Sequence, residues 1–175
     1  DPFFYTRCIE RVTEKLGKPT LLVNNASLFE KIPFDRVSQE VFNQYFDLHV
    51  KAPFFLSQAL ANIGAEGAII NLLDSRVDTY ETEHFIYTLT KKTLKEMTLL
   101  LAKTLAPKIR VNGICPGPIL PPEHLGQEYL NRVAEKTPMK RPGAVKDILS
   151  AVQYLTRSTY VNGEILFVDG GGRLI

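Results

Sequence analysis

Three side chains that can exchange protons lie close together between Ile70 and Leu94. Asp74 follows an apolar run, Tyr87 comes thirteen residues later, and Lys91 follows after four more. Because residues four apart share one face of a helix, Tyr87 and Lys91 are expected to point the same way. A phenol has a pKa of about 10, and a nearby ammonium lowers it, which makes the phenol a usable acid. The spacing predicts a proton donor, Tyr87, tuned by Lys91 and accompanied by the carboxylate of Asp74.

Each feature also has an ordinary explanation when it is taken alone. A Tyr and a Lys four apart arise often by chance, and an Asp after a strand usually caps a turn. Asn24–Ser27 and Pro116–Pro118 are typical of turns and loop breakers. Their joint placement favours a site, because ligands of open parallel sheets bind outside the carboxyl ends of the strands. Asp74 and both loops follow predicted strands, so we expect them at one edge of the sheet.

The elements that position these residues alternate between short apolar strands and longer helices. Strands are expected at Thr20–Val23, Ala68–Leu73, Ile109–Ile114 and Glu164–Val168. Helices are expected at about Phe4–Gly17, Ser38–Asn62, Glu83–Leu105 and Ala144–Thr156, with a short one inside Pro121–Pro142. Ser38 is the expected N-cap of the second helix, which continues through Pro53. Strands that are apolar on both faces predict an α/β fold in which helices cover both sides of a parallel sheet.

Length and composition exclude several classes of protein. The 175 residues fit a single domain, and a net charge of +2 gives no electrostatic case for nucleic acid. Cys8 and Cys115 are far apart and follow no CxxC spacing, which argues against a disulfide framework or a zinc site. No apolar run approaches the ~20 residues of a membrane span, and the start of the chain lacks the features of a signal peptide. We predict a cytoplasmic protein with no metal and no membrane partner.

Four motifs in their order along the chain resemble the short-chain dehydrogenase/reductase family. They are "LLVNNAS" at Leu21–Ser27, "YTLTK" at Tyr87–Lys91, "IRVNGICPGPI" at Ile109–Ile119 and "FVDGG" at Phe167–Gly171. The resemblance covers nearly the whole chain. It implies a Rossmann-type, doubly wound parallel sheet with helices on both faces, a nicotinamide dinucleotide, and hydride transfer to a carbonyl or an imine.

The resemblance also implies roles for individual residues. Tyr87 is the catalytic tyrosine, and Lys91 binds the nicotinamide ribose and lowers the tyrosine pKa. The remaining residues expected to border the cofactor are Asn25, Ala26, Ser27, Pro116, Gly117, Pro118 and Ile119.

Departures from the usual family pattern point to one branch. Ser27 and Asp74 replace the usual Gly and Ser, and His49 replaces the usual Asn. Pteridine reductases share "NNAS" followed by a Phe at the position of Phe29, together with the Asp, and a dihydromonapterin reductase type shares the "HV-x-x-P" stretch. This similarity implies that Phe29 stacks on a pterin, with core packing as its ordinary alternative. His49 is expected to be a structural hydrogen-bonding residue rather than a base.

The substrate-binding residues expected from this branch are Ser27, Phe29, Asp74 and Tyr87. Asp74 is expected to accept a hydrogen bond from a ring NH or an exocyclic amine of the pterin and to pass a proton through Tyr87. The predicted function is NADPH-dependent reduction of a dihydropterin or dihydrofolate-like substrate by a homotetramer. NADPH rather than NADH rests on resemblance alone.

Two other functions stay open. One is a reductase of ketones or 3-oxoacyl thioesters, for which Ser is the expected residue at position 74. The other is a non-catalytic relative that serves as a binding module, against which Tyr87 and Lys91 argue. The family's glycine-rich TGxxxGxG turn does not occur in these 175 residues. We therefore expect an N-terminal βαβ portion, with this turn, to belong to the full protein.

Overall fold

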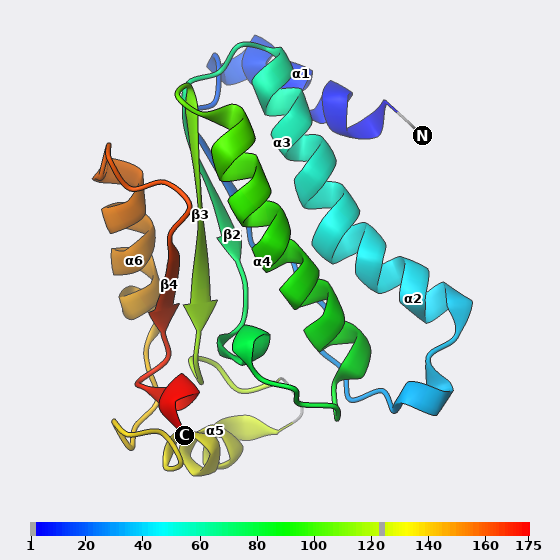
Figure 1. The fold of residues 1–175 in the computed structure, drawn as a ribbon, viewed down its shortest axis with the longest axis vertical. Coiled ribbons are helices and arrows are strands. Elements are labelled where there is room, and N and C mark those ends of the chain that lie inside the picture. Colours follow the sequence, from blue (N-terminus) through cyan, green and yellow to red (C-terminus); the bar gives the residue numbers. More distant parts are fainter. Residues whose placement is uncertain (1–2, 123–124) are drawn as a thin grey trace.

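A parallel sheet organises the computed structural model, which describes residues 3–122 and 125–175. Within these ranges four strands lie side by side in the order β1-β2-β3-β4, all parallel (Figure 1). They are β1 (Leu21–Asn24), β2 (Gly67–Leu72), β3 (Ile109–Pro116) and β4 (Ile165–Val168). The predicted fold class and all four predicted strands are confirmed. Residues 123–124 of the predicted 121–142 segment lie outside the described residues, as do the first two residues of the chain.

The helices begin and end where local sequence signals place them. They are α1 (Phe4–Leu16), α2 (Gln39–Phe46), α3 (Ala52–Asn62), α4 (Phe85–Leu105), α5 (Gly126–Ala134) and α6 (Val145–Arg157). Ser38 caps α2, because its hydroxyl accepts from the Val41 backbone N–H at 3.2 Å. Gly17, with φ of 83°, ends α1 in a conformation that favours glycine.

The predicted helix Ser38–Asn62 is interrupted at its middle. A π-helical turn, Asp47–Lys51, separates α2 from α3. Pro53 lies in the first turn of α3, where its missing N–H leaves no helical hydrogen bond unmade. The single long helix that we predicted is therefore two helices joined by a wider turn, and that turn carries His49 into the interior.

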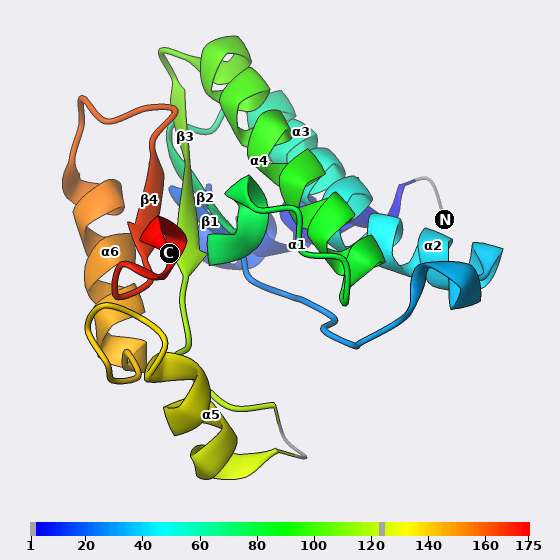
Figure 2. The same ribbon diagram turned by 60° about the horizontal axis from the view of Figure 1, so that its bottom comes forward.

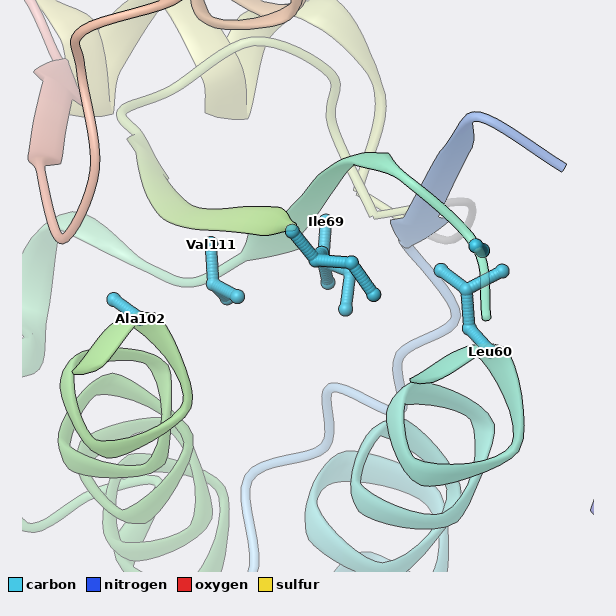
Figure 3. Packing of buried hydrophobic residues seen from close by; sticks show 6 residues of the cluster. Leu60, Ile69, Ala102 and Val111 are labelled. Atoms are coloured by element: carbon cyan, nitrogen blue, oxygen red, sulfur yellow. The ribbon is translucent and has the colours of Figure 1, made fainter. Parts of the chain in front are cut away.

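Helices cover the two faces of the sheet as predicted. Helices α3 and α4 lie on one face and α6 lies on the other (Figures 1 and 2). Figure 3 shows Ile69 of β2 and Val111 of β3 between Leu60 of α3 and Ala102 of α4. Side chains of this size each contribute about 1.5–3 kcal/mol when they are fully buried. This packing fixes the angle of α4, which carries the tyrosine, against the sheet.

Strand β1 departs from the prediction of burial on both faces. Leu22 pairs with Ile69 and faces the covered side, whereas Val23 pairs with Ile70 and faces the side of α6. Leu21 and Val23 are each 37% exposed, because α6 packs over β2, β3 and β4 and leaves these two side chains beyond its reach.

Side-chain amides of Asn24, which is half-buried, and Asn71, which is buried, connect the ends of β1 and β2. The Asn24 side chain donates to Asn71 Oδ1 at 2.7 Å, and the Asn71 side chain donates to Thr98 Oγ1 on α4 at 2.8 Å. Since all the strands are parallel, the segments after β1, β2 and β3 leave the sheet at the same edge. No helix in the described ranges is long and apolar enough to cross a membrane.

Candidate active site

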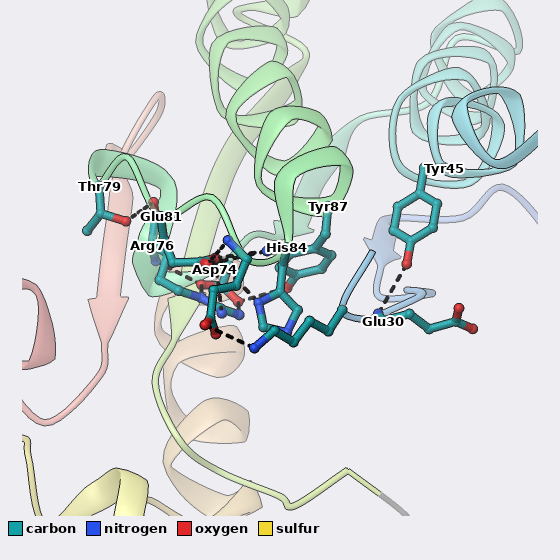
Figure 4. A network of polar contacts seen from close by, with 10 residues as sticks. Glu30, Tyr45, Asp74, Arg76, Thr79, Glu81, His84 and Tyr87 are labelled. Atoms are coloured by element: carbon teal, nitrogen blue, oxygen red, sulfur yellow. Dashed lines mark hydrogen bonds and ion pairs between the residues drawn. The ribbon is translucent and has the colours of Figure 1, made fainter. Parts of the chain in front are cut away.

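Asp74 and Tyr87 meet at the carboxyl edge of the sheet. Asp74 lies just beyond β2, at the start of the 3-10 turn Ser75–Asp78, and Tyr87 lies in the first turn of α4. The Tyr87 hydroxyl donates to Asp74 Oδ2 at 2.8 Å (Figure 4). Both side chains are largely buried, that of Asp74 being 15% exposed. The juxtaposition expected from the strand end and the helix spacing is present.

A third member of this group, Arg76, was not predicted. Its backbone N–H and its Nε each donate to Asp74 Oδ1, at 2.8 and 2.9 Å, and its Nη2 donates to Oδ2 at 3.0 Å. Its guanidinium carbon lies 4.9 Å from the ring centre of Phe29 and 5.6 Å from that of Tyr87. An arginine two residues after the acid is a weak signal in sequence, because nothing in that spacing tells which way its side chain turns.

The surroundings set the charge states of Asp74 and Tyr87. Burial alone would raise the pKa of Asp74, but the hydrogen bonds and the positive charge of Arg76 outweigh it and hold that pKa below its ordinary value. Burial raises the pKa of Tyr87 strongly, and the negative charge of Asp74 raises it further. The carboxylate is therefore ionised and the phenol protonated across the neutral range.

Lys91 lies behind the phenol and does not have the effect that was expected of it. Its Nζ donates to the Leu72 carbonyl at 2.8 Å and lies 5.7 Å from the centre of the Tyr87 ring. Burial lowers the pKa of Lys91 to about 8. The expectation that Lys91 lowers the tyrosine pKa is wrong for this arrangement, because desolvation and the adjacent carboxylate of Asp74 dominate.

A cavity of about 620 Å³ opens beside Asp74 and Tyr87. Its walls come from the loop after β1, the turn after β2, the first turn of α4, the loop after β3, helix α5 and the segment after β4. The predicted residues in these walls are Phe29, Asp74, Tyr87, Pro116, Gly117 and Pro118. A second cavity of about 390 Å³ shares Gly117 and Pro118 and adds Ile119.

The structure does not bring every predicted residue to these cavities. Asn25, Ala26 and Ser27 are exposed and lie in the walls of neither. Sequence reasoning in turn missed the wall made by α5 and the segment after β4. Its residues include Tyr129, Leu130, Val133, Lys136 and Arg173. A short amphipathic helix gives no sign in sequence of which cavity it will close.

Phe29 is neither a free stacking platform nor an ordinary core residue. Its ring stacks on His84 with ring centres 4.4 Å apart, and it meets the Tyr87 ring edge-on at 4.9 Å. It is 37% exposed and lines the larger cavity. The contacts with His84 and Arg76 fix the ring while leaving part of its surface open to a ligand.

His49 is held by neutral hydrogen bonds, as predicted for a structural residue. The Leu28 backbone N–H donates to its Nε2 at 3.1 Å, so Nδ1 carries the proton and donates to Thr90 Oγ1 at 2.8 Å. Thr90 Oγ1 in turn donates to the Tyr87 carbonyl at 2.9 Å, and Ser27 Oγ lies 3.0 Å from Nε2. Burial, and secondly the charge of Lys91, lower the pKa of His49 to about 3. The imidazole of His49 is therefore neutral at neutral pH and only a weak base there.

One group of potential metal ligands clusters within the described ranges. Carboxylate and imidazole atoms of Glu81, Glu83 and His84 lie within 4.8 Å of one another. Glu83 pairs with Lys31 at 2.9 Å, and Glu81 accepts from the backbone N–H groups of Glu83 and His84. These contacts account for the cluster as a turn that precedes α4.

Comparison with known proteins agrees with this fold and site. The sequence model of the enoyl-(acyl carrier protein) reductase family matches residues 1–172. The chain belongs to the short-chain dehydrogenase/reductase family.

Within that family the chain is similar to proteins of two kinds. It is 32% identical to dihydromonapterin reductase of Enterobacter sp. (strain 638), over 86% of this chain and 65% of that protein. It is 30% identical to the granaticin polyketide synthase putative ketoacyl reductase 2 of Streptomyces violaceoruber, over 97% of this chain and 72% of that protein. The chain thus spans about two thirds of the length of these relatives.

Among solved structures the chain is similar to FolM alternative dihydrofolate reductase 1 from Brucella suis, which is in complex with NADP. The TM-score is 0.93 at 31% identity, over 98% of this chain and 71% of that one. The corresponding enzyme from Brucella canis, also with NADP, gives a TM-score of 0.89 at 32% identity, over 97% of this chain and 69% of that one.

Proposed function

We propose that this protein is an NADPH-dependent reductase of a dihydropterin or dihydrofolate-like substrate. The observation that carries the proposal is the Tyr87 hydroxyl on Asp74, at 2.8 Å, in the wall of a cavity that Phe29 also lines. A carboxylate at this position departs from the usual serine of the family. Similarity to a dihydromonapterin reductase and to two dihydrofolate reductases bound to NADP supports the substrate class and the cofactor.

The residues present fit the nicotinamide end of such a cofactor. Lys91 has three N–H donors, and one of them goes to the Leu72 carbonyl; because Lys91 is buried and lines neither cavity, its side chain must turn before the other two can reach ribose hydroxyls. Gly117 and Pro118 lie between the two cavities, within reach of a ligand that spans both. When it is bound, the nicotinamide supplies the hydride. Asn25, Ala26, Ser27 and Ile119 remain proposed neighbours of the cofactor.

The chain's own residues orient the substrate and supply the proton. Phe29 lines the cavity, and a flat heteroaromatic ring could stack on it in place of His84 or of the Arg76 guanidinium, for about 0.5–1.5 kcal/mol beyond burial. Tyr87 donates its proton to the substrate nitrogen as the neighbouring carbon is reduced. Proton donation by a placed side chain contributes about 10²–10⁴-fold to a rate.

NADPH oxidation tests the proposal directly. The protein is assayed at equal concentrations of a dihydropterin, dihydrofolate, a simple ketone and a 3-oxoacyl thioester. The two pteridines are expected to be reduced and the carbonyl substrates to react at least about tenfold more slowly in kcat/KM. Turnover of the thioester alone would support the ketoacyl reductase alternative. Tight NADPH binding without turnover of any substrate would support a binding module.

The proposal extends to the domain structure of the protein, its location and its assembly. We propose one reductase domain over residues 1–175, located in the cytoplasm, in a homotetramer. Support for assembly comes from the exposed apolar side chains of Phe54, Phe55, Leu99 and Leu100 on α3 and α4. Met97, on the same helix α4, is already buried within this chain and adds nothing to this exposed surface. A monomer by light scattering at micromolar concentration would contradict the tetramer.

A further inference from the structure

The hydrogen-bonding capacity of Asp74 is filled by the protein itself. A carboxylate has about four acceptor positions on its two oxygens. Three are taken by Arg76, through its backbone N–H, its Nε and its Nη2, and the fourth is taken by the Tyr87 hydroxyl. A substrate N–H can therefore reach Asp74 only by replacing one of these donors.

The turn that holds Arg76 makes this arrangement local and firm. Thr79 closes the turn, because its backbone N–H and its hydroxyl both donate to the Arg76 carbonyl, at 2.9 and 3.0 Å (Figure 4). The Arg76 side chain is 29% exposed, and its Nη1 lies 3.8 Å from the Glu81 carboxylate, too far for a strong hydrogen bond. The bidentate fork to Asp74 is the geometry in which an arginine binds a carboxylate most strongly.

We infer that Arg76 is a positioning residue that keeps Asp74 an acceptor, so that the proton given to the substrate comes from Tyr87 and not from Asp74. This inference rests on the proposed reductase function, in which Tyr87 is the proton donor, and adds the residue that keeps Asp74 in place and ionised. The expected direct contact between Asp74 and the pterin N–H groups is replaced by an indirect role. Asp74 orients the phenol, and Arg76 fixes Asp74.

The proton and electron balance of the step follows from this assignment. The nicotinamide cofactor, when bound, would supply a hydride, and thus two electrons, for the ring carbon of the substrate C=N bond. The Tyr87 hydroxyl, which donates to Asp74 here, turns its proton to the substrate nitrogen; its O–H bond breaks, an N–H bond forms, and the oxidised cofactor and a phenolate would remain. Burial and the charge of Asp74 disfavour this phenolate, and the positive charge of Arg76, 5.6 Å from its ring centre, offsets them only in part. Solvent in the cavity then returns a proton to the phenolate.

Every charged or titratable group around Asp74 bears on the test. Arg76 comes from the same turn and Glu81 from the segment that follows it, Tyr87 and Lys91 come from α4, and Cys115 comes from β3. Burial lowers the pKa of Lys91 to about 8, and burial raises that of the Cys115 thiol to about 12. Neither group titrates in the acid range, and the NMR signal assigned with Asp74→Asn separates the Asp74 carboxyl from that of Glu81, which faces Arg76.

The experiment compares Arg76→Met, Arg76→Lys and the parent protein. The pH profile of kcat/KM for a dihydropterin is measured from about pH 5 to about pH 9. In the same buffers, carbon-13 NMR of the aspartate carboxyls is followed in substrate-free protein, with Asp74→Asn to assign the signal. Arg173→Met is the matched control, because Arg173 lines the same cavity and stacks on a ring, that of Phe167 at 4.1 Å, and contacts a different aspartate, Asp169, through its backbone N–H.

In the parent protein and in Arg173→Met, the Asp74 signal should stay that of a carboxylate throughout the range. In Arg76→Met, burial without the guanidinium moves its titration into the range, the profile gains an acid limb, and kcat/KM at neutral pH falls about tenfold or more. Arg76→Lys should lie between the two and covers the case that Arg76→Met does not fold.

Two results would overturn the inference. One is an Asp74 signal in folded Arg76→Met or Arg76→Lys that titrates as in the parent protein, and the other is an equal acid limb in Arg173→Met. The NMR titration needs no substrate. If the parent protein reduces no pterin, the proposed function fails while the role of Arg76 is still decided by the titration.

Discussion

Two hydrogen-bond networks hold Tyr87, and they differ in charge and in access to solvent. The first runs from Leu28 through His49 and Thr90 to the tyrosine backbone, and all its buried bonds are between neutral groups. The second runs from Arg76 through Asp74 to the tyrosine hydroxyl, carries a full ion pair, and borders a cavity. One network fixes where the residue is, and the other fixes what its hydroxyl does.

The difference shows how this site separates stability from chemistry. A neutral buried network stabilises the fold only if every member is satisfied, since an unpaired group costs about 1–3 kcal/mol. A charged network at a cavity gains less for the fold, but it sets protonation states where a ligand arrives. Substitutions in the first network should therefore change stability more than rate, and substitutions in the second should do the reverse.

The largest effect is expected from Tyr87→Phe, which cuts the second network and leaves the first intact. Loss of the proton donor should lower kcat for a dihydropterin by about 10²–10⁴-fold. The Thr90 bond goes to the backbone carbonyl and survives the change, so the free energy of unfolding should change by at most about 1–2 kcal/mol. Stopped-flow kinetics and denaturant unfolding on one preparation check both statements. Turnover close to that of the parent would remove Tyr87 from the mechanism.

Asp74→Ser is expected to lower kcat/KM by about ten- to a hundredfold, because the phenol loses its charged acceptor. If Asp74 acts through Tyr87, the rates for a dihydropterin and for a slowly reduced simple ketone should fall together, and kcat should change more than KM. A loss confined to the pterin, with a raised KM, would instead restore the direct contact between Asp74 and the substrate. NADPH affinity, measured by fluorescence, serves as the control for a general defect.

The sequence predicts the placement of these networks better than their bonding. Parallel strands and the four-residue spacing of Tyr87 and Lys91 are regular features of the sequence. They correctly predict that the motifs after the strands lie at one edge of the sheet and that Tyr87 lies near Asp74. The clamp by Arg76 depends on a side-chain rotamer, and the stack of His84 on Phe29 depends on two segments meeting in space. Neither leaves a periodic trace.

The electrostatic prediction failed for a related reason. From spacing alone, Lys91 was the nearest charge to the phenol, and a positive charge there is expected to lower the pKa of Tyr87. In the fold, burial and the carboxylate of Asp74 act on the hydroxyl more strongly than an ammonium that is bonded to Leu72. A pKa is set by the closest partner and by desolvation, and both are properties of the assembled site.

Thr90→Val tests the neutral network from the other side. The change removes the hydroxyl that accepts from His49 and donates to the Tyr87 carbonyl, and it leaves the His49 Nδ1–H without its partner in a fully buried position. The free energy of unfolding should fall by about 1–3 kcal/mol, while kcat of the folded protein changes less than about tenfold. Thr90→Ser keeps the hydroxyl and is the matched control. If Thr90→Val had the stability of the parent protein but a low kcat, the neutral network would affect the rate, and the division of roles between the two networks would be wrong.

The smallest expected effect is on stability in mild acid, to which His49 contributes and the Asp74–Arg76 pair does not. His49 has a pKa of about 3 in the folded chain, against an ordinary value of 6.5. Between these values the unfolded chain binds the proton and the folded chain does not, so stability is lost as the pH falls through the ordinary value. One such group lowers the free energy of unfolding by about 1.4 kcal/mol between about pH 7.5 and about pH 5.5. The Asp74–Arg76 pair adds nothing in that pH range, because the lowered pKa of Asp74 moves its own contribution to more acid conditions.

Urea unfolding at about pH 7.5 and about pH 5.5 should show this loss of unfolding free energy in the parent protein and a clearly smaller one in His49→Gln, whose amide does not titrate. An equal loss in both proteins would mean that His49 is protonated in the folded chain, and the neutral network would then have to be redrawn as a charged one.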